Sequence, residues 1–314
     1  MSLLDFPLHN VCIIMTKEFM DVRSNHLSGV LPTELGLMNK LIYLDLGINK
    51  FLSVIPTEIG LLRSLIALGL QVNMMTGSLP TELGNLTQLR YLSIAASSFQ
   101  GNIPKELGNL KKLTFLNLSL NKLTGSLPTE LEHMTSLTYL EVSSNQFNMS
   151  IPTELGNLAG LVYFNLENNN LTGSLPSELG MLTRLENCSV YNNHITGTIP
   201  TELKNLAQLS FFAVNTNNIT GPIPSELGRL TSLTYLAVAE NQLNSTIPAE
   251  LGRLAQLVTF FAYDNDLSGS LPFELGLLTR LTILSTYSNH INSTIPTEFG
   301  NQLNRLCFQL IPII

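Results

Sequence analysis

Twelve prolines recur along this chain at a constant interval of 24 residues, from Pro32 to Pro296, with no insertion or deletion between them. A sequence that repeats at a fixed period in the twenties predicts a solenoid, in which each repeat forms one turn and packs only against its neighbours. The 314 residues are therefore expected to form one elongated domain, although that length is also compatible with two. Because the repeat explains most residues, function has to be sought where the repeat varies.

Residues 113–137 show the pattern of a single repeat. Leu116-Asn117-Leu118 alternates between apolar and polar with the period of two that is typical of a short strand. The proline and the Thr-Glu pair that follows it indicate the start of a short helical turn. Stacked turns place their strands about 4.8 Å apart, so twelve of them are expected to span roughly 50 Å of parallel sheet.

In eleven of the twelve turns an asparagine follows the predicted strand, where the chain turns inward and leaves backbone groups without sheet partners. An amide side chain has two donors and an acceptor, so a column of asparagines can satisfy backbone groups of neighbouring turns. Ser97 replaces the asparagine in one turn, and its single hydroxyl predicts a locally weaker turn. The predicted structural ladder consists of Asn49, Asn73, Asn121, Asn145, Asn169, Asn193, Asn217, Asn241, Asn265 and Asn289.

The pattern Asn-x-Leu-Thr-Gly-Ser-Leu-Pro-Ser/Thr-Glu-Leu-Gly, seen at residues 169–180 and in variants along the chain, resembles the plant-type leucine-rich repeat. That class is found in the extracellular part of receptor-like kinases and in polygalacturonase-inhibiting proteins. The resemblance covers residues 19–300 and implies an α/β solenoid, a right-handed and horseshoe-like superhelix. It also implies a parallel concave sheet, a short second sheet and short 3-10 or α turns on the convex side. The function it implies is recognition of a protein or peptide.

The ends of the chain depart from the repeat. We expect an incomplete or irregular N-terminal cap at residues 1–18, a solenoid of about twelve repeats at 19–300, and an irregular, truncated C-terminal end at 301–314. Cys12 and Cys307 lie at opposite ends, beyond disulfide reach, and Cys188 occupies a ladder position as a buried apolar residue. Extracellular members of the resembled class carry cysteine pairs in both caps, which this sequence lacks.

Two locations therefore stay open. The chain is extracellular or at the cell surface if it is a fragment of a longer parent, which the irregular ends favour. It is cytoplasmic if it is complete, since residues 1–20 do not have the composition of a signal peptide.

Composition argues against several classes of function. The net charge of −7 and the lack of basic clusters speak against nucleic acid as a partner. No apolar run approaches about 18 residues, so we expect no direct membrane insertion. The glutamate two residues after each proline recurs in every turn, which indicates an architectural role and not catalysis. With no catalytic signature and scattered histidines, we expect a non-enzymatic protein without cofactor or metal.

The outward residues of the predicted strands vary, and aromatic residues gather on them in the C-terminal half. Large aromatics beside small polar residues are typical of the central contacts of protein interfaces. Aromatics at the first strand position, such as Tyr43 and Tyr235, recur in most turns and are interpreted as framework. The candidate partner-binding surface on the concave face consists of Tyr191, Asn215, Glu240, Phe261, Tyr263, Asp264 and Tyr287.

Serine and threonine also form columns beside the predicted second sheet. Hydroxyls about 4.8 Å apart could match a periodic surface such as ice or a polysaccharide, although the same residues suit a tight polar turn. These columns are Thr76, Thr124, Thr172, Thr196 and Thr220, and Ser78, Ser126, Ser150, Ser174, Thr198, Thr246 and Thr294.

Eight Asn-x-Ser/Thr sequences occur, and in a secreted protein they are acceptor sites for glycans. Asn117 and Asn187 are expected to face the concave sheet, where a glycan would obstruct binding. The possible glycosylation sites are therefore Asn85, Asn148, Asn170, Asn218, Asn244 and Asn292.

Overall fold

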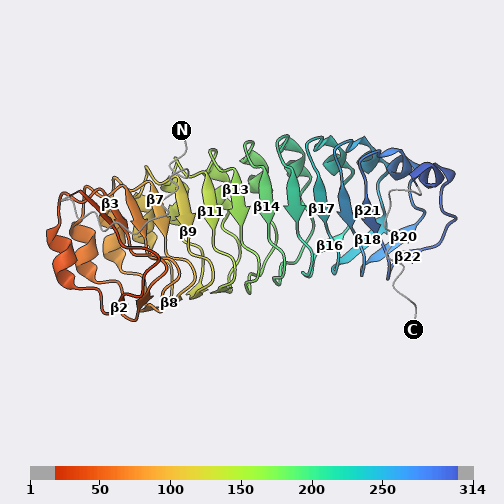
Figure 1. Cartoon of the computed structure of the whole chain (residues 1–314). Helices are drawn as coiled ribbons and strands as arrows, with labels where there is room; N and C mark the ends of the chain where they lie inside the picture. Colours follow the sequence, from red (N-terminus) through yellow and green to blue (C-terminus); the bar gives the residue numbers. More distant parts are fainter. Residues whose placement is uncertain (1–17, 303–314) are drawn as a thin grey trace.

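The computed structural model describes residues 18–302, which form a solenoid of stacked turns (Figure 1). Residues 1–17 and 303–314, which include Cys12 and Cys307 and make up most of the expected irregular ends 1–18 and 301–314, lie outside the described residues. Each turn adds one strand to a 12-stranded parallel sheet in which neighbours in the sequence are neighbours in space. Strand residues pair with the residues 24 positions later, as Leu44 does with Leu68. The predicted α/β solenoid is confirmed.

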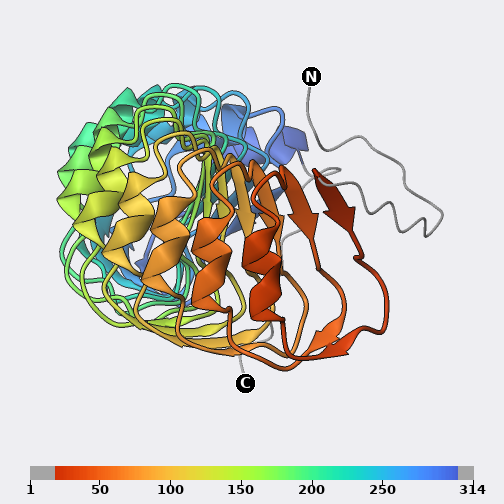
Figure 2. The same ribbon diagram turned by 90° about the vertical axis from the view of Figure 1, so that its left-hand side faces the viewer.

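The long sheet lies on the inside of the curve and helical turns lie on the outside (Figure 2). Its strands are β1 (Phe19–Asp21), β3 (Tyr43–Asp45), β5 (Ala67–Gly69), β7 (Tyr91–Ser93), β9 (Phe115–Asn117), β11 (Tyr139–Glu141), β13 (Tyr163–Asn165), β14 (Asn187–Ser189), β15 (Phe211–Ala213), β17 (Tyr235–Ala237), β19 (Thr259–Phe261) and β21 (Ile283–Ser285).

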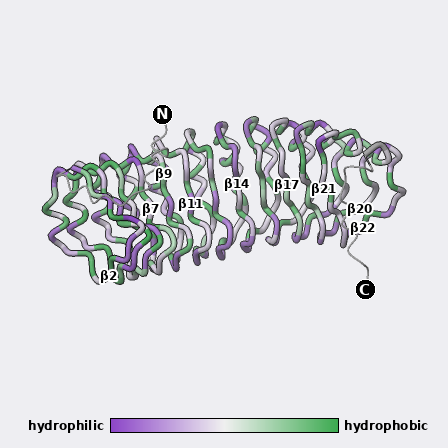
Figure 3. The backbone as a smooth tube through the Cα atoms, viewed as in Figure 1, coloured by the Kyte–Doolittle hydropathy of each residue, from purple (hydrophilic) through white to green (hydrophobic). Residues whose placement is uncertain are grey.

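The middle residue of these strands points into the core. Leu68, Leu92 and Leu116 are all fully buried, and burying a leucine side chain stabilises a fold by about 1.5–3 kcal/mol. Each turn therefore alternates between apolar and polar segments along its course (Figure 3). This alternation, repeated at every turn, is what makes the stack a single continuous core.

The ladder asparagines tie successive turns together. The Nδ2 atom of Asn121 donates to Ile94 O at 2.9 Å, one turn earlier, and to Leu118 O at 3.1 Å in its own turn. Its Oδ1 atom accepts from the backbone N–H of Phe99 at 3.1 Å. One buried amide thus satisfies backbone groups of two turns, which the strands alone would leave unpaired.

A second set of strands lies along one flank, and it is broken into three separate sheets. The breaks fall near Ser53 and Met149, where these residues replace the glycine that adopts a positive φ in most turns. The strands are β2 (Ser28–Gly29) and β4 (Lys50–Phe51); β6 (Thr76–Gly77), β8 (Ser98–Gly101), β10 (Lys122–Gly125) and β12 (Gln146–Phe147); and β16 (Thr220–Gly221), β18 (Gln242–Thr246), β20 (Asp266–Gly269) and β22 (His290–Ile291). Two isolated bridges, Ser150 to Thr172 and Ser174 to Thr196, fill part of the second gap.

The convex side consists of short 3-10 helices, as the resemblance implied. Each follows a proline, as η2 follows Pro56, whose backbone is extended with φ −67°. Where a hydroxyl residue comes before the glutamate of the first turn, the glutamate in most turns accepts from it, as Glu58 does from Thr57 at 3.2 Å. The helices are η1 (Thr33–Leu37), η2 (Thr57–Leu61), η3 (Thr81–Asn85), η4 (Lys105–Asn109), η5 (Thr129–His133), η6 (Thr153–Asn157), η7 (Ser177–Met181), η8 (Thr201–Asn205), η9 (Ser225–Arg229), η10 (Ala249–Arg253), η11 (Phe273–Leu277) and η12 (Thr297–Gln302).

Candidate functional site

The first residue of each strand in the long sheet faces outward, and most of these residues are aromatic. Their rings stack on one another because the strand spacing is close to the preferred distance between stacked rings. Phe19 and Tyr43 form one such pair, at 4.4 Å between ring centroids. A longer stack of four rings, with neighbouring centroids 4.3–4.6 Å apart, consists of Tyr91, Phe115, Tyr139 and Tyr163.

In the last turns the ring contacts leave this column and cross the sheet. Phe211 stacks on Tyr235 at 4.4 Å, and Tyr235 meets Phe261 edge to face at 5.9 Å. Phe261 meets Tyr263 at 5.9 Å, again edge to face, and Tyr263 stacks on Tyr287 at 4.6 Å. We call these five residues the aromatic band. The contacts cross the sheet because β19 carries Thr259 at its first position and Phe261 at its third.

Two carboxylates flank the aromatic band. The hydroxyl of Tyr263 donates to Glu240 Oε1 at 3.2 Å, and Glu240 Oε2 accepts from Thr216 Oγ1 at 3.1 Å. Burial, followed by the charge of Glu240, raises the pKa of Tyr263 to about 12. Asp264 comes directly after Tyr263 and is exposed. Three successive turns are thus linked by side-chain hydrogen bonds at the edge of the band.

Both carboxylates stand where the backbone takes a left-handed conformation, with φ of 52° at Glu240 and 50° at Asp264. This position precedes a ladder asparagine in every described turn except that of Ala96, where Ser97 follows, and it lies where the chain leaves the strand. The asparagine that follows holds the backbone in place: Asn241 Nδ2 donates to Val238 O at 3.2 Å. The ladder therefore fixes the direction in which the carboxylates leave the sheet.

The structure brings together most of the residues that the sequence singled out. Phe261, Tyr263, Tyr287 and Glu240 are joined by ring contacts or a hydrogen bond. Tyr191 and Asn215 are half-buried on the same face in earlier turns, and no ring contact joins Tyr191 to the band within residues 18–302.

The interpretation of the first-position aromatics as framework is incomplete. Phe211 and Tyr235 do stack between turns, but they are half-buried on the concave face and continuous with Phe261. The signal was present in the sequence: where Thr259 interrupts the aromatic column, an aromatic residue appears two positions later.

Sequence reasoning also missed a polar cluster in the middle of the concave face. Glu141, in β11, is only 7% exposed. Its Oε2 atom accepts from the Tyr163 hydroxyl at 3.0 Å and from Asn165 Nδ2 at 3.2 Å, and its Oε1 atom accepts from the backbone N–H of Ser143 at 3.0 Å. Burial, and then the charge of Glu141, raise the pKa of Tyr163. The sequence did contain a signal for this cluster: Glu141 is a glutamate at a strand position that holds a serine or an asparagine in the neighbouring turns.

A third cluster lies at the N-terminal end of the concave face. Arg23 pairs with Asp21 at 3.3 Å and with Asp45 at 3.6 Å. The hydroxyl of Tyr43 donates to Asp45 Oδ2 at 3.3 Å. Burial raises the pKa of Asp45. The carboxylates of this cluster form ion pairs with Arg23, whereas the carboxylates farther along the described sheet form none.

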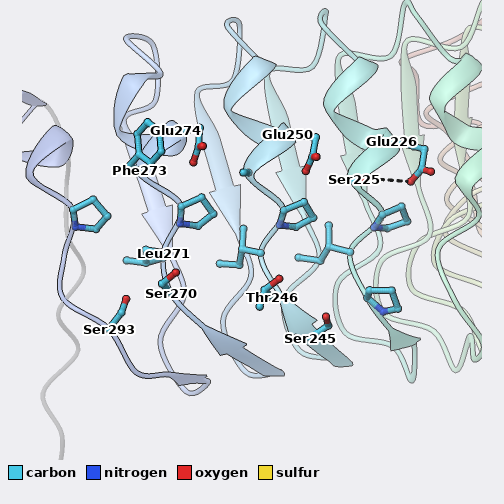
Figure 4. A pocket seen from close by; sticks show the side chains of 18 of the residues that line it. Ser225, Glu226, Ser245, Thr246, Glu250, Ser270, Leu271, Phe273, Glu274 and Ser293 are labelled. Carbon is cyan, nitrogen blue, oxygen red and sulfur yellow. Dashed lines mark hydrogen bonds between the residues drawn. The ribbon is translucent and has the colours of Figure 1, made fainter.

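An open groove of about 1120 Å³ follows the flank of the last five turns. Figure 4 shows hydroxyls such as Thr246 and Ser270 on the side of the second sheet and Glu226 and Glu250 on the side of the 3-10 helices, with prolines between the two rows. Equivalent residues line each turn. The groove is therefore formed by residues that recur from turn to turn, whereas the aromatic band is formed by residues that occur in only one part of the long sheet.

The six possible glycosylation sites are all exposed. Asn85 ends η3 on the convex side, whereas Asn244 lies within β18 on the flank. Residues 18–302 contain no cluster of His, Cys, Asp and Glu side chains placed to hold a metal ion. In that same span, no helix has the length and apolar character needed to cross a bilayer.

Comparison with known proteins identifies the family. A family model described as a leucine-rich repeat region matches residues 6–150 and 145–311. The chain belongs to the leucine-rich-repeat proteins. No curated protein sequence is significantly similar to it.

Solved structures show that the resemblance to plant-type repeats is correct. The ectodomain of the Arabidopsis receptor kinase HAESA, solved with the peptide hormone IDA and a co-receptor, is 33% identical with a TM-score of 0.86, over 90% of this chain and 47% of that one. The ectodomain of the Arabidopsis thaliana receptor kinase GASSHO1/SCHENGEN3, in complex with CASPARIAN STRIP INTEGRITY FACTOR 2, is 32% identical with a TM-score of 0.79, over 92% of this chain and 38% of that one. This leucine-rich-repeat chain thus spans less than half the length of these receptor structures.

A plant ice-binding protein is also similar, at 28% identity and a TM-score of 0.69, over 81% of this chain and 83% of that one.

Proposed function

We propose that this leucine-rich-repeat protein is a non-enzymatic scaffold that binds a peptide or an extended protein segment along its concave sheet. The observation that carries the proposal is the aromatic band, five rings in continuous contact from Phe211 to Tyr287 on an open face. The receptor structures with bound peptides support the same use of this fold. Tyr191 and Asn215 extend the surface towards the middle of the sheet.

The mechanism is rigid display. Each ring is held by a neighbouring ring or a hydrogen bond, and the strand beneath it is part of a continuous core. Little conformational freedom is therefore lost when a ligand docks, so more of the contact energy appears as affinity. Tyrosine suits this role because it offers a large apolar area and a polar tip with few rotatable bonds.

The test is capture of partners by chemical cross-linking in an extract of the native source. A variant with Tyr191→Ala, Tyr263→Ala and Tyr287→Ala is compared with the wild type. The matched control replaces three exposed residues of the convex helices: Leu61→Ala, Met181→Ala and Leu277→Ala. A partner retained by the wild type and the control but lost by the tyrosine variant supports the proposal. Equal capture by all three proteins contradicts it.

We further propose that the chain works in an extracellular or cell-surface setting and carries glycans, as part of a signalling receptor. The receptor ectodomains with this fold and the six exposed acceptor asparagines support this proposal. Expression through a secretory pathway, followed by enzymatic removal of N-linked glycans, tests it. A mass unchanged by that treatment would argue for the cytoplasmic alternative.

A second candidate function is binding to ice or to a polysaccharide surface through the flank. Exposed hydroxyls such as Ser126, Ser174 and Thr246 and the similar plant ice-binding protein favour it. The division of the flank into three separate sheets speaks against it, because a crystalline surface requires a regular spacing over many turns. Thermal hysteresis, measured for the wild type and for Ser126→Tyr with Ser174→Tyr, distinguishes the two functions. An activity that the bulky variant loses would place the function on the flank.

A further inference from the structure

The charges of the concave face are unbalanced. Within residues 18–302, the outward positions at and just beyond the strands of the long sheet carry six carboxylates but only one cation, Arg23. Arg23 pairs with Asp21 and Asp45 at the N-terminal end. No cation pairs with the other four carboxylates of this described face: Glu141, Glu167, Glu240 and Asp264.

These four carboxylates fall into two pairs along the sheet. Glu141 and Glu167 belong to the neighbouring turns of β11 and β13, and Glu240 and Asp264 to those of β17 and β19. Three strand intervals separate Glu167 from Glu240, which is about 14 Å at the usual spacing. The surface between them carries uncharged, half-buried residues such as Tyr191 and Asn215.

The second pair lies against aromatic rings. Glu240 accepts a hydrogen bond from the hydroxyl of Tyr263, and the exposed Asp264 follows Tyr263 in the chain. Tyr287 stacks on Tyr263 at 4.6 Å, so its ring lies beside the tyrosine that Glu240 binds. Burial, and then the charges of Asp264 and Glu240, raise the pKa of Tyr287. A ring face beside a carboxylate suits a guanidinium or ammonium group, because the ring attracts the cation and the carboxylate pairs with it. The same surface repels sulfate, phosphate and carboxylate groups of a ligand.

We propose that the ligand of the concave face is a basic peptide, with one cationic side chain held at Glu240 and Asp264 against Tyr263 and Tyr287, and another held at Glu167, next to the buried Glu141. Glu167 lies three strand intervals from Glu240 and four from Asp264, which is about 14–19 Å at the usual spacing. An extended peptide advances about 3.3 Å per residue, so the two cationic side chains are separated by about four to six positions. The inference rests on the proposed peptide-binding function and assigns the chemistry of its ligand.

The experiment begins with selection of peptides from a random library displayed on phage, using the whole chain as bait. We expect selected peptides to be enriched in arginine and lysine at a spacing of about four to six residues. One selected peptide, labelled with fluorescein, is then titrated against the variant Glu240→Gln with Asp264→Asn. The matched control is Glu226→Gln with Glu250→Gln, which removes two negative charges from η9 and η10 on the other side of the solenoid.

The expected result for the concave variant is a loss of affinity of at least about tenfold, since one charge-assisted hydrogen bond contributes that much. For the control variant we expect a loss of less than about twofold. Replacing the peptide's arginines by neutral citrulline should produce the same loss. Thermal melting of both variants checks that they remain folded.

Three other outcomes would overturn the inference. Selected peptides of neutral or acidic character that lose affinity for the tyrosine-to-alanine variant would refute the basic ligand but leave the peptide-binding scaffold intact. An equal loss for both charge variants would show attraction by overall charge instead of a site. Failure to enrich any peptide would refute both the inference and the proposed function.

Discussion

Asn121 Oδ1 accepts a hydrogen bond of 3.1 Å from the backbone N–H of Phe99, which lies 22 residues earlier in the preceding turn. The equivalent bond recurs along the ladder, as between Asn145 and Leu123 at 2.9 Å. Ser97 breaks the series, because its hydroxyl donates to Asn73 O at 3.4 Å and not to a residue 22 positions earlier. An asparagine at position 97 would accept from the backbone N–H of Met75, by analogy with the other turns. Within residues 18–302, this N–H has no acceptor.

Ser97→Asn should therefore stabilise the protein. The backbone N–H of Ser97 already donates to Leu120 O at 3.2 Å, as the ladder asparagines do in their own turns, so an amide fits the same geometry. We expect a gain of about 1 kcal/mol from the new hydrogen bonds. Chemical denaturation measures it, and slower hydrogen exchange at Met75 would localise it. An unchanged denaturation midpoint would mean that water already satisfies this turn.

Gly60→Ala should destabilise the stack. A Cβ atom at Gly60 would lie 2.6 Å from Glu82 O in the next turn, so the two 3-10 helices would have to separate. Overpacking of this kind costs about 1–3 kcal/mol. The control is Gly300→Ala, at the equivalent position of the last described helix, where a Cβ meets none of the atoms of residues 18–302 within 4 Å. Equal melting temperatures for the two variants would contradict the close packing of the helices.

A core substitution should destabilise the protein more than a surface substitution. The two variants compared are Leu118→Ala and the double change Tyr263→Ala with Tyr287→Ala. Leu118 is fully buried, whereas Tyr287 is 36% exposed. Truncating the leucine leaves a cavity and is expected to cost about 2–5 kcal/mol. The tyrosine pair should cost less, since its rings rest on the sheet and do not fill the core. Thermal melting measures both, and a larger loss for the tyrosine pair would show that the band is structural.

Alkaline pH should destabilise the protein because its partly buried tyrosines ionise. Burial raises the pKa of Tyr91, Tyr139 and Tyr235, and that of Tyr263 is raised to about 12. Because the folded pKa lies above the unfolded value of about 10, the fold favours the neutral phenol. Stability is therefore fully present below about pH 10 and is lost as the pH rises towards 12. Ultraviolet absorbance of tyrosinate measures the titration, and Tyr263→Phe should reduce the pH-dependent loss.

Cys188 should be unreactive in the native protein. It is 2% exposed in the core, and burial raises the pKa of its thiol to about 12. Thiol reagents attack the thiolate, which is scarce and inaccessible at neutral pH. In a Cys12→Ser, Cys307→Ser background, labelling with a disulfide reagent should be negligible until denaturant is added. Rapid labelling without denaturant would reveal local opening at β14.

The repeat made most of the fold predictable. A period of 24 residues places every leucine of one turn against its counterpart in the next, so one correctly interpreted repeat determines the others. Leu116 and Asn121 illustrate this: both positions were assigned from the alternation and spacing alone, and both are buried. The breaks in the flank were less predictable, because the loss of glycine at Ser53 and Met149 interrupts pairing, whereas Ser245 adopts a φ of 72° and continues it.

The sequence by itself determined the solenoid, the inward leucines and the outward face on which Phe261, Tyr263 and Tyr287 lie, since these follow from strand alternation within one repeat. Only the tertiary structure decided which outward residues meet. Contact between Tyr235 and Phe261, or between Tyr263 and Glu240, depends on side-chain directions in adjacent turns 23 to 26 residues apart. A local pattern indicates the face on which a side chain lies, but the packing of neighbouring turns decides which side chains touch.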